Sequence, residues 1–177
     1  TRTSTGYTFA GWKDAFGNTF EGIEIGDYSY GDITLNAYWT TNTYSIAFNV
    51  SGIDYQPVLD GLALPNKLSY TVEEALILPN YDIEGYIFNG WYEGSVKVTG
   101  ISVGTTGDKV FTAKFTPLTY SITCYDDGTA INSFNYTIES SVELEPLPDG
   151  DYEFDSWIDA NGNKRTTVEQ GSTGNIY

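Results

Sequence analysis

A seven-residue phrase occurs three times in this chain, and it constrains the fold more than any other feature. The copies are GYTFAGW at 6–12, GYIFNGW at 85–91 and DYEFDSW at 151–157. Recurrence of a phrase at long spacing is typical of tandem structural units that pack on their neighbours. Such arrays usually present, space or bind other molecules, so the phrase predicts the kind of protein better than its ligand.

The similarity extends beyond the phrase and defines three repeats. Strand-like tails follow the first two copies at 31–39 and 107–115, and GNIY at 174–177 begins a third tail. We therefore predict the C-terminal part of a first repeat unit at 1–39, a complete second unit at 43–115, and a third unit at 119–177 that lacks the end of its last strand. Because both outer units are partial, we expect the chain to be a fragment of a longer array.

Alternation of apolar and polar residues predicts strands along most of the chain. Tyr44, Ile46 and Phe48 share one face of a head strand, and Tyr120, Ile122 and Cys124 occupy the matching positions of the third repeat. In the tails, Leu35, Ala37 and Trp39 match Phe111, Ala113 and Phe115. A short helix around 73–76 is weakly supported, since neighbouring β-branched residues disfavour it. The predicted class is mainly β.

Charge and hydropathy exclude several classes of partner. Eight Lys and Arg against 24 Asp and Glu give a net charge of −16, spread along the chain. Such a field repels nucleic acid and anionic membranes. No apolar run approaches the roughly 20 residues of a membrane span, and no signal peptide opens the chain. We expect no nucleic-acid partner and no membrane insertion by this segment.

The residue types also leave little room for catalysis, a cofactor or a metal site. The absence of His excludes His-dependent triads and His-ligated metals, and a single Cys excludes an intramolecular disulfide. Cys124 is expected to be a buried apolar residue. With 24 acidic residues, a carboxylate pair at hydrolase spacing carries no specific signal. The segments 14–18 and 159–163 favour hairpin turns over calcium loops, because the closing Glu of such a loop is absent.

The aromatic residues divide into a repeated and a non-repeated set. Those of the phrase recur in register, so we expect them to form the structural core of each repeat: Tyr7, Phe9, Trp12, Tyr86, Phe88, Trp91, Tyr152, Phe154 and Trp157. The alternative is that they are exposed and stack on sugar rings. The non-repeated aromatics are candidates for contact with a partner: Phe16, Phe20, Tyr28, Tyr30 and Tyr55. The longer loop of the second repeat, 51–69, is a further candidate.

The order of TYSI, YTVEEALILP, GYIFNGWY and GISVGTTGDKVFTAKF resembles the Listeria–Bacteroides repeat, the B-repeat module of internalin-type bacterial surface proteins. The resemblance covers essentially the whole chain, although Asp151 and Ser156 replace the usual glycines in the third repeat. It implies tandem small β-grasp-like units, with mixed sheets and at most a short helix per unit. It also implies an extracellular location, at the bacterial cell surface or cell wall, and no catalytic residues or cofactors.

The expected function is that of a non-catalytic stalk, spacer or adhesive module. Links of about four residues, 40–43 and 116–119, would give a semi-rigid rod, monomeric and part of a longer chain. Its partner would be a host or bacterial surface protein or a glycan. The alternative is a carbohydrate-binding module with exposed aromatics, and hydrolysis is a third interpretation. The rod predicts that Trp12, Trp91 and Trp157 are buried and equivalently packed, and that the third repeat has an open sheet edge.

Overall fold

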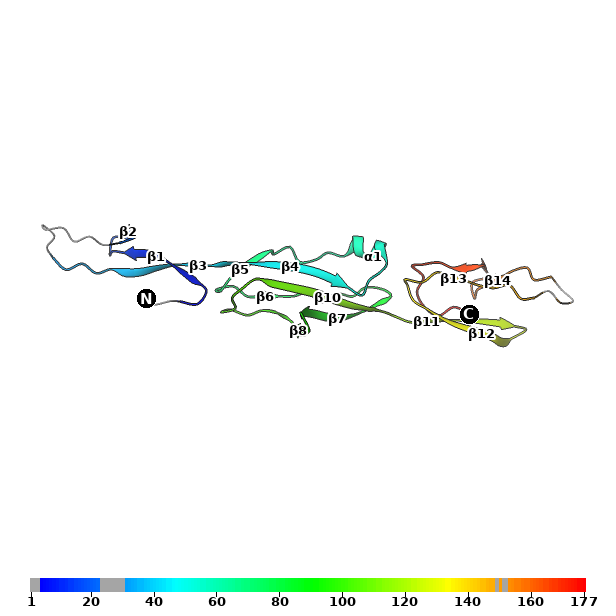
Figure 1. Ribbon diagram of the computed structural model, residues 1–177. Coiled ribbons are helices and arrows are strands. Elements are labelled where there is room, and N and C mark those ends of the chain that lie inside the picture. The colour runs from blue at the N-terminus through cyan, green and yellow to red at the C-terminus, as the bar shows by residue number, and fades with distance from the viewer. Residues whose placement is uncertain (1–3, 23–30, 149, 151–152) are drawn as a thin grey trace.

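The computed structural model describes residues 4–22, 31–148, 150 and 153–177, and these residues form an elongated series of β-rich segments (Figure 1). The first repeat contains β1 (Tyr7–Lys13), β2 (Thr19–Phe20) and β3 (Asn36–Thr41). The second contains β4 (Thr43–Ser51), α1 (Gln56–Gly61), β5 (Ser69–Thr71), β6 (Leu76–Ile77), β7 (Tyr86–Glu93), β8 (Val96–Val98), β9 (Gly100–Ile101) and β10 (Lys109–Pro117). The third contains β11 (Tyr120–Asp126), β12 (Thr129–Tyr136), β13 (Val142–Glu143), β14 (Trp157–Ile158), β15 (Lys164–Arg165) and β16 (Thr167–Val168). The predicted mainly β class is confirmed.

The second repeat is built on a mixed five-stranded sheet with the order β5-β4-β10-β7-β8. Strand β10 lies at its centre, parallel to β4 and antiparallel to β7. The alternation predicted for this tail is confirmed, because Phe111, Ala113 and Phe115 are all buried on one face. They pack with Ile46 and Trp91 in the largest apolar core of the described residues.

Among the described residues the only helix is α1, and it lies in the long loop of the second repeat. The weakly supported helix around 73–76 is replaced by a turn between β5 and β6. The carboxylate of Glu74 accepts a hydrogen bond from the backbone NH of Thr71, and Leu76 then pairs with Ile101 on β9. Pairing with a strand distant in sequence therefore overrides a weak local helix tendency.

The third repeat has a similar arrangement of strands, but its sheets have only two strands each among the described residues. Its core consists of Ile122, Cys124, Tyr136, Leu144 and Val168. Burial raises the pKa of the Cys124 thiol, as expected for an apolar position. Strand β11 pairs with β12, and a single parallel bridge joins Ile122 to Ile176. That bridge matches the pairing of Ile46 with Lys109 in the second repeat. Within the described residues β11 has no further partner strand on that side.

A cavity of about 330 Å³ lies beside this open edge, lined in part by Cys124, Leu144, Phe154 and Trp157. These residues match side chains that surround β10 in the second repeat. The cavity therefore corresponds to the space that a central strand fills in the complete sheet.

A substitution at Gly52, the residue after β4, tests how closely the backbones of β4 and β10 approach each other. Gly52 has φ +83°, and a Cβ there would lie 1.9 Å from the carbonyl oxygen of Phe115. We expect Gly52→Ala to destabilise the second repeat by about 3 kcal/mol or more, because the backbone itself must move. Gly94→Ala is the control: its φ is +61° with open space around it, so only about 1–2 kcal/mol of conformational strain is expected. Urea unfolding of the two variants, followed by Trp fluorescence, measures the difference, and equal losses would contradict this explanation.

Candidate functional site: the junctions between repeats

The tail strand of one repeat leads almost directly into the head strand of the next. Only Asn42 separates β3 from β4, and only Leu118 and Thr119 separate β10 from β11. The backbone NH groups of Asn42 and Leu118 donate to the carbonyl oxygens of Gly6 and Gly85 respectively. The expected links of about four residues are therefore shorter, because extended strand pairing continues into them. A link this short restricts the relative motion of the repeats.

Both junctions contain the same tyrosine–glutamate hydrogen bond. The hydroxyl of Tyr7 donates to Glu73 at 3.0 Å, and the hydroxyl of Tyr86 donates to Glu139 at 2.9 Å. In each case the Tyr belongs to the phrase of one repeat and the Glu to the middle segment of the next. Burial, followed by the hydrogen bond to Glu139, raises the pKa of Tyr86 well above its usual range. This hydroxyl therefore remains a donor at every physiological pH.

The glycine that begins the phrase makes the second shared contact. Gly6 and Gly85 have φ near +82° and +83°, and each faces a β-branched side chain of the following repeat. A Cβ at Gly6 would lie 1.9 Å from Cγ1 of Val72, and one at Gly85 would lie 2.8 Å from Cδ1 of Ile138. Ile138 is 4% exposed and packs in the core cluster of the preceding repeat. Glycine is therefore required both for the backbone conformation and for the contact.

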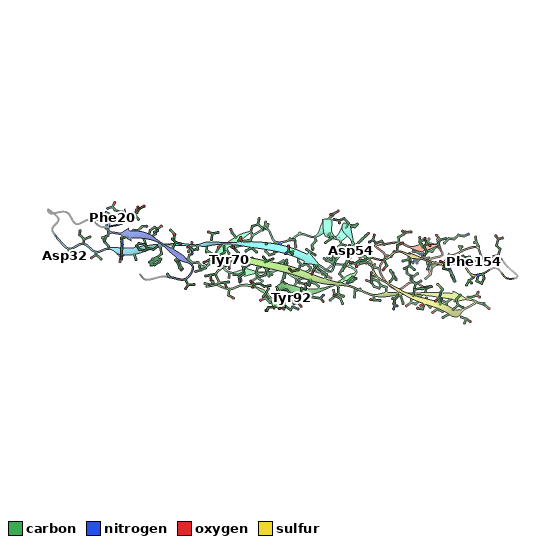
Figure 2. All side chains as sticks on the ribbon, viewed as in Figure 1. Phe20, Asp32, Asp54, Tyr70, Tyr92 and Phe154 are labelled. Atoms are coloured by element: carbon green, nitrogen blue, oxygen red, sulfur yellow. The ribbon has the colours of Figure 1, made fainter. Side chains whose placement is uncertain are left out.

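The junction between the second and third repeats has additional contacts. Glu139 also accepts the backbone NH of Asp54 at 2.6 Å, and Thr173 donates to Glu84 at 2.7 Å. Figure 2 shows Asp54 at the end of the second repeat that faces the third. Tyr55, which the sequence predicts to contact a partner, lies beside Gly171 of the third repeat and packs against the core of the second. The long loop 51–69 thus contributes to a contact within the chain.

The phrase aromatics are not equally buried. Trp91 is 2% exposed and Tyr86 6%, and Phe88 packs at the edge of the same core. The side chains of Tyr7, Trp12, Phe154 and Trp157 are half-buried, Phe9 is 41% exposed, and Tyr152 lies outside the described residues. The expectation of equal tryptophan burial is wrong, because among the described residues only Trp91 lies in a five-stranded sheet, whereas Trp12 lies in a three-stranded sheet and Trp157 in a two-stranded one.

One feature of tryptophan packing is nevertheless shared. The indole NH of Trp91 donates to the carbonyl oxygen of Pro79, and that of Trp157 donates to Glu145, each 12 positions upstream. In the first repeat Phe9 instead packs edge-on against Trp12 and Trp39. The second and third phrases therefore use their tryptophans in the same way, at different depths of burial.

The remaining partner candidates lie in the first repeat. Phe16 is 90% exposed at the turn after β1, and Phe20 is 39% exposed on β2. Tyr28 and Tyr30 lie outside the described residues.

The two glutamates of the junctions were not identified from the sequence, although their spacing in the repeats could have shown them. Glu73 and Glu139 recur three positions after the aligned residues Tyr70 and Tyr136.

Two aspartates organise the turns that follow the phrase. Asp14 accepts the backbone NH groups of Phe16 and Asn18, and Asp159 accepts those of Asn161 and Asn163. The predicted hairpin turns are therefore present, and the carboxylates are occupied by turn donors.

Within the described ranges, no three Cys, Asp or Glu side chains are grouped as metal ligands would be. No helix in the same ranges has the length and apolar character needed to cross a membrane.

The turn around Asp159 in the third repeat is expected to lose stability in acid. The backbone hydrogen bond from Asn163 and the side chain of Arg165, 2.7 Å away, hold the Asp159 pKa far below its ordinary value of 3.8. A depressed folded-state pKa stabilises the protein above the unfolded pKa, and this contribution is lost as pH falls below about 4 toward the folded value. We expect the protection of the amides at 159–165, relative to their intrinsic exchange rates at each pH, to fall in acid more than that of the second repeat. Asp159→Asn should remove that pH dependence, and an unchanged acid response would contradict the assignment.

A mainly β chain with a mixed five-stranded sheet in its central segment is the class that the described residues show. Residues 44–114 match the Listeria-Bacteroides repeat domain family, so this segment is a Listeria-Bacteroides repeat domain. The chain is also a distant homologue of Internalin H of Listeria monocytogenes serovar 1/2a, with 30% identity over 148 residues. The match covers 72% of this chain and 24% of that protein.

A second relative is described as a Gly-rich membrane protein of Evansella cellulosilytica, 24% identical over 155 residues that cover 84% of this chain and 17% of the relative. The chain thus spans a quarter or less of the curated relatives it matches. No solved structure matches the chain significantly. The family and the relation to Internalin H are those of bacterial surface proteins.

Proposed function

We propose that this segment is a semi-rigid, non-catalytic spacer in an extracellular protein of the bacterial cell surface or cell wall. The observation that carries the proposal is the equivalence of the two junctions, each with a Gly, a Tyr–Glu hydrogen bond and a nearly continuous strand. Equivalent junctions give each repeat the same relation to the next, which is what an extended stalk needs. The net charge of −16 opposes lateral association of neighbouring stalks.

The proposal includes the repeat boundaries 1–39, 43–115 and 119–177, each repeat being a β-grasp-like unit or part of one. In the second repeat the first and last long strands, β4 and β10, are parallel neighbours at the centre of a mixed sheet. That arrangement supports a compact unit closed by its own tail strand. Two core clusters support the division, although Ile138 of the third repeat packs in the cluster of the second.

The rod can be tested by measuring the distance between spin labels on neighbouring repeats. Labels at Ser95→Cys and Ala130→Cys, in a Cys124→Ala background, report on the junction between the second and third repeats. We expect one narrow distance peak. Glu139→Gln should broaden the peak, because its side chain becomes a weaker acceptor for Tyr86 and Asp54. A broad distribution in the parent protein would overturn the rod.

The alternative of carbohydrate binding is favoured by one observation, the aromatic group of the first repeat. Phe9 and Phe20 are partly exposed and Phe16 is almost fully exposed, on elements close to Trp12. A glycan screen separates the two functions: the spacer predicts no binding above background. Binding that is lost in Phe16→Ala and retained in Ile77→Ala, an equally exposed apolar position (87%), would support the alternative.

A further inference from the structure

We propose that Asn161 is a site of spontaneous deamidation, in which the backbone nitrogen of Gly162 attacks the side-chain amide and water completes the reaction. Asparagine is among the thermolabile residues of proteins, and a following glycine favours the attack because it has no Cβ to shield the nitrogen. The sequence contains two such pairs, Asn89-Gly90 and Asn161-Gly162. The structure makes them unequal. This modification site is independent of the proposed spacer function.

The reaction consumes water and releases ammonia. The backbone nitrogen of Gly162 loses its proton to hydroxide and forms a bond to Cγ of Asn161, and the side-chain nitrogen leaves as ammonia, which gives a succinimide ring. Water then opens the ring. Cleavage of the bond between this nitrogen and Cγ gives aspartate with the original backbone. Cleavage of its bond to the backbone carbonyl carbon gives isoaspartate, whose backbone is longer by one carbon.

The pair at 161–162 lies in an exposed turn between β14 and β15. The side chain of Asn161 is exposed, and Gly162 has φ +83° with nothing within 4 Å of an added Cβ. The backbone NH of Gly162 donates to the carbonyl oxygen of Asp159 at 2.8 Å, so the turn must open to free the nitrogen. Behind the turn β14 and β15 pair through two residues each. A short turn on so small a ladder opens at low free energy.

The pair at 89–90 is held in the central sheet. The side-chain amide of Asn89 donates to Oγ1 of Thr116 at 2.7 Å. Gly90 is buried, it pairs with Lys114 on the central strand β10, and a Cβ at this position would lie 2.4 Å from Cε of Lys97. Its nitrogen becomes accessible only when the five-stranded sheet opens. The same two residue types are therefore reactive in one place and protected in the other.

Deamidation at Asn161 would loosen the turn that contains it. The carboxylate of Asp159 accepts the backbone NH groups of Asn161 and Asn163, and it also pairs with Arg165 at 2.7 Å. An isoaspartate lengthens the backbone between the two NH donors, so both can no longer reach the same carboxylate. Either product also adds a negative charge beside Asp159. The pairing of Trp157 with Arg165, which closes the ladder, then loses its support.

Peptide mapping by mass spectrometry tests the site on the whole chain. The protein is held in mildly alkaline buffer and sampled over time, and an isoaspartyl methyltransferase labels the isoaspartate. In the folded protein we expect product at Asn161 to accumulate at least about tenfold faster than at Asn89, because the two segments differ in the free energy of opening. In guanidinium, where both segments are unfolded, the two rates should converge. Equal rates in the folded protein would overturn the proposal.

Asn161→Gln is the matched variant for the effect on the turn. Glutamine keeps a neutral amide but would have to close a larger ring, and the turn uses only the backbone NH of this residue to bind Asp159. In the parent protein the amide-exchange protection at 157–165 should fall in step with product at Asn161. The variant should retain that protection over the same period. Loss of protection at the same pace in both proteins would show that deamidation does not loosen the turn.

Discussion

Replacing Trp91 by alanine is expected to destabilise the second repeat by about 3–5 kcal/mol, the usual loss for a large aromatic residue removed from a core. Trp91 is 2% exposed and packs against Phe48, Tyr81 and Phe88. Its indole NH donates to the carbonyl oxygen of Pro79 at 2.7 Å. The substitution therefore creates a cavity and removes this hydrogen bond, and both effects act in the same direction.

The other aromatic positions serve as graded controls. Trp157→Ala removes the equivalent hydrogen bond from a half-buried side chain, so it should cost less than Trp91→Ala. Phe16→Ala, at a 90% exposed position, should leave stability unchanged within about 0.5 kcal/mol. Urea unfolding, combined with amide exchange of β4 and β10, assigns each loss to its repeat. Equal losses at Trp91 and Trp157 would show that burial does not determine the role of this position.

The third repeat is expected to open well before the second. In the second repeat the first three residues of β4 pair with β5, and the other six pair with the central strand β10. Its counterpart β11 pairs along its length with β12 alone and has one isolated bridge at Ile122 on the other side, within the residues that the structure describes. The cavity of about 330 Å³ beside Cys124 removes further packing. A sheet with an unpaired edge and an unfilled core opens at lower free energy.

Native-state hydrogen exchange measures this difference directly. Amides of β10 and the central part of β4 should exchange only with unfolding of the second repeat, and those of β11 should exchange much faster. A peptide with the sequence of residues 107–117 provides a second measurement, because it carries the apolar alternation of Phe111, Ala113 and Phe115. If it fills the space beside β11, protection of β11 should rise. A peptide with Asp at the Ala113 position is the control, since Ala113 is 0% exposed in the complete sheet. Equally slow exchange in β4 and β11 would contradict the prediction.

Much of the fold could be predicted from the local pattern of apolar and polar residues in the sequence. Alternation placed Ile46, Phe111 and Cys124 on inward faces, and the short polar segments at 14–18 and 159–163 formed turns. These features depend on neighbours close in sequence, where period-two spacing directly sets which face a side chain occupies. The weak helix tendency at 73–76 was overridden because the partner of Leu76 is Ile101, and pairing of that kind is not visible in a local window.

The candidate site was largely invisible to the same reasoning. The Tyr7–Glu73 and Tyr86–Glu139 hydrogen bonds join residues 66 and 53 positions apart, from different repeats. Sequence periodicity assigned the phrase to the interior of each unit, yet its first two residues form the contact with the next unit. Tyr55 and the loop 51–69 were expected to meet an external partner, and that stays a prediction; the structure adds that Tyr55 lies beside Gly171 of the third repeat.

The sequence by itself determined that the phrase recurs and that the chain is mainly β, because the spacing of the phrase and the alternation of apolar residues are properties of the residue order. It also determined where the phrase loses its glycine, at Asp151. Only the tertiary structure decided what that glycine does, since its role depends on Val72 and Ile138 of the following repeats lying within contact distance. The physical reason is that a junction is made by surfaces that meet only after each repeat has folded. The requirement for a residue without a Cβ arises at that meeting.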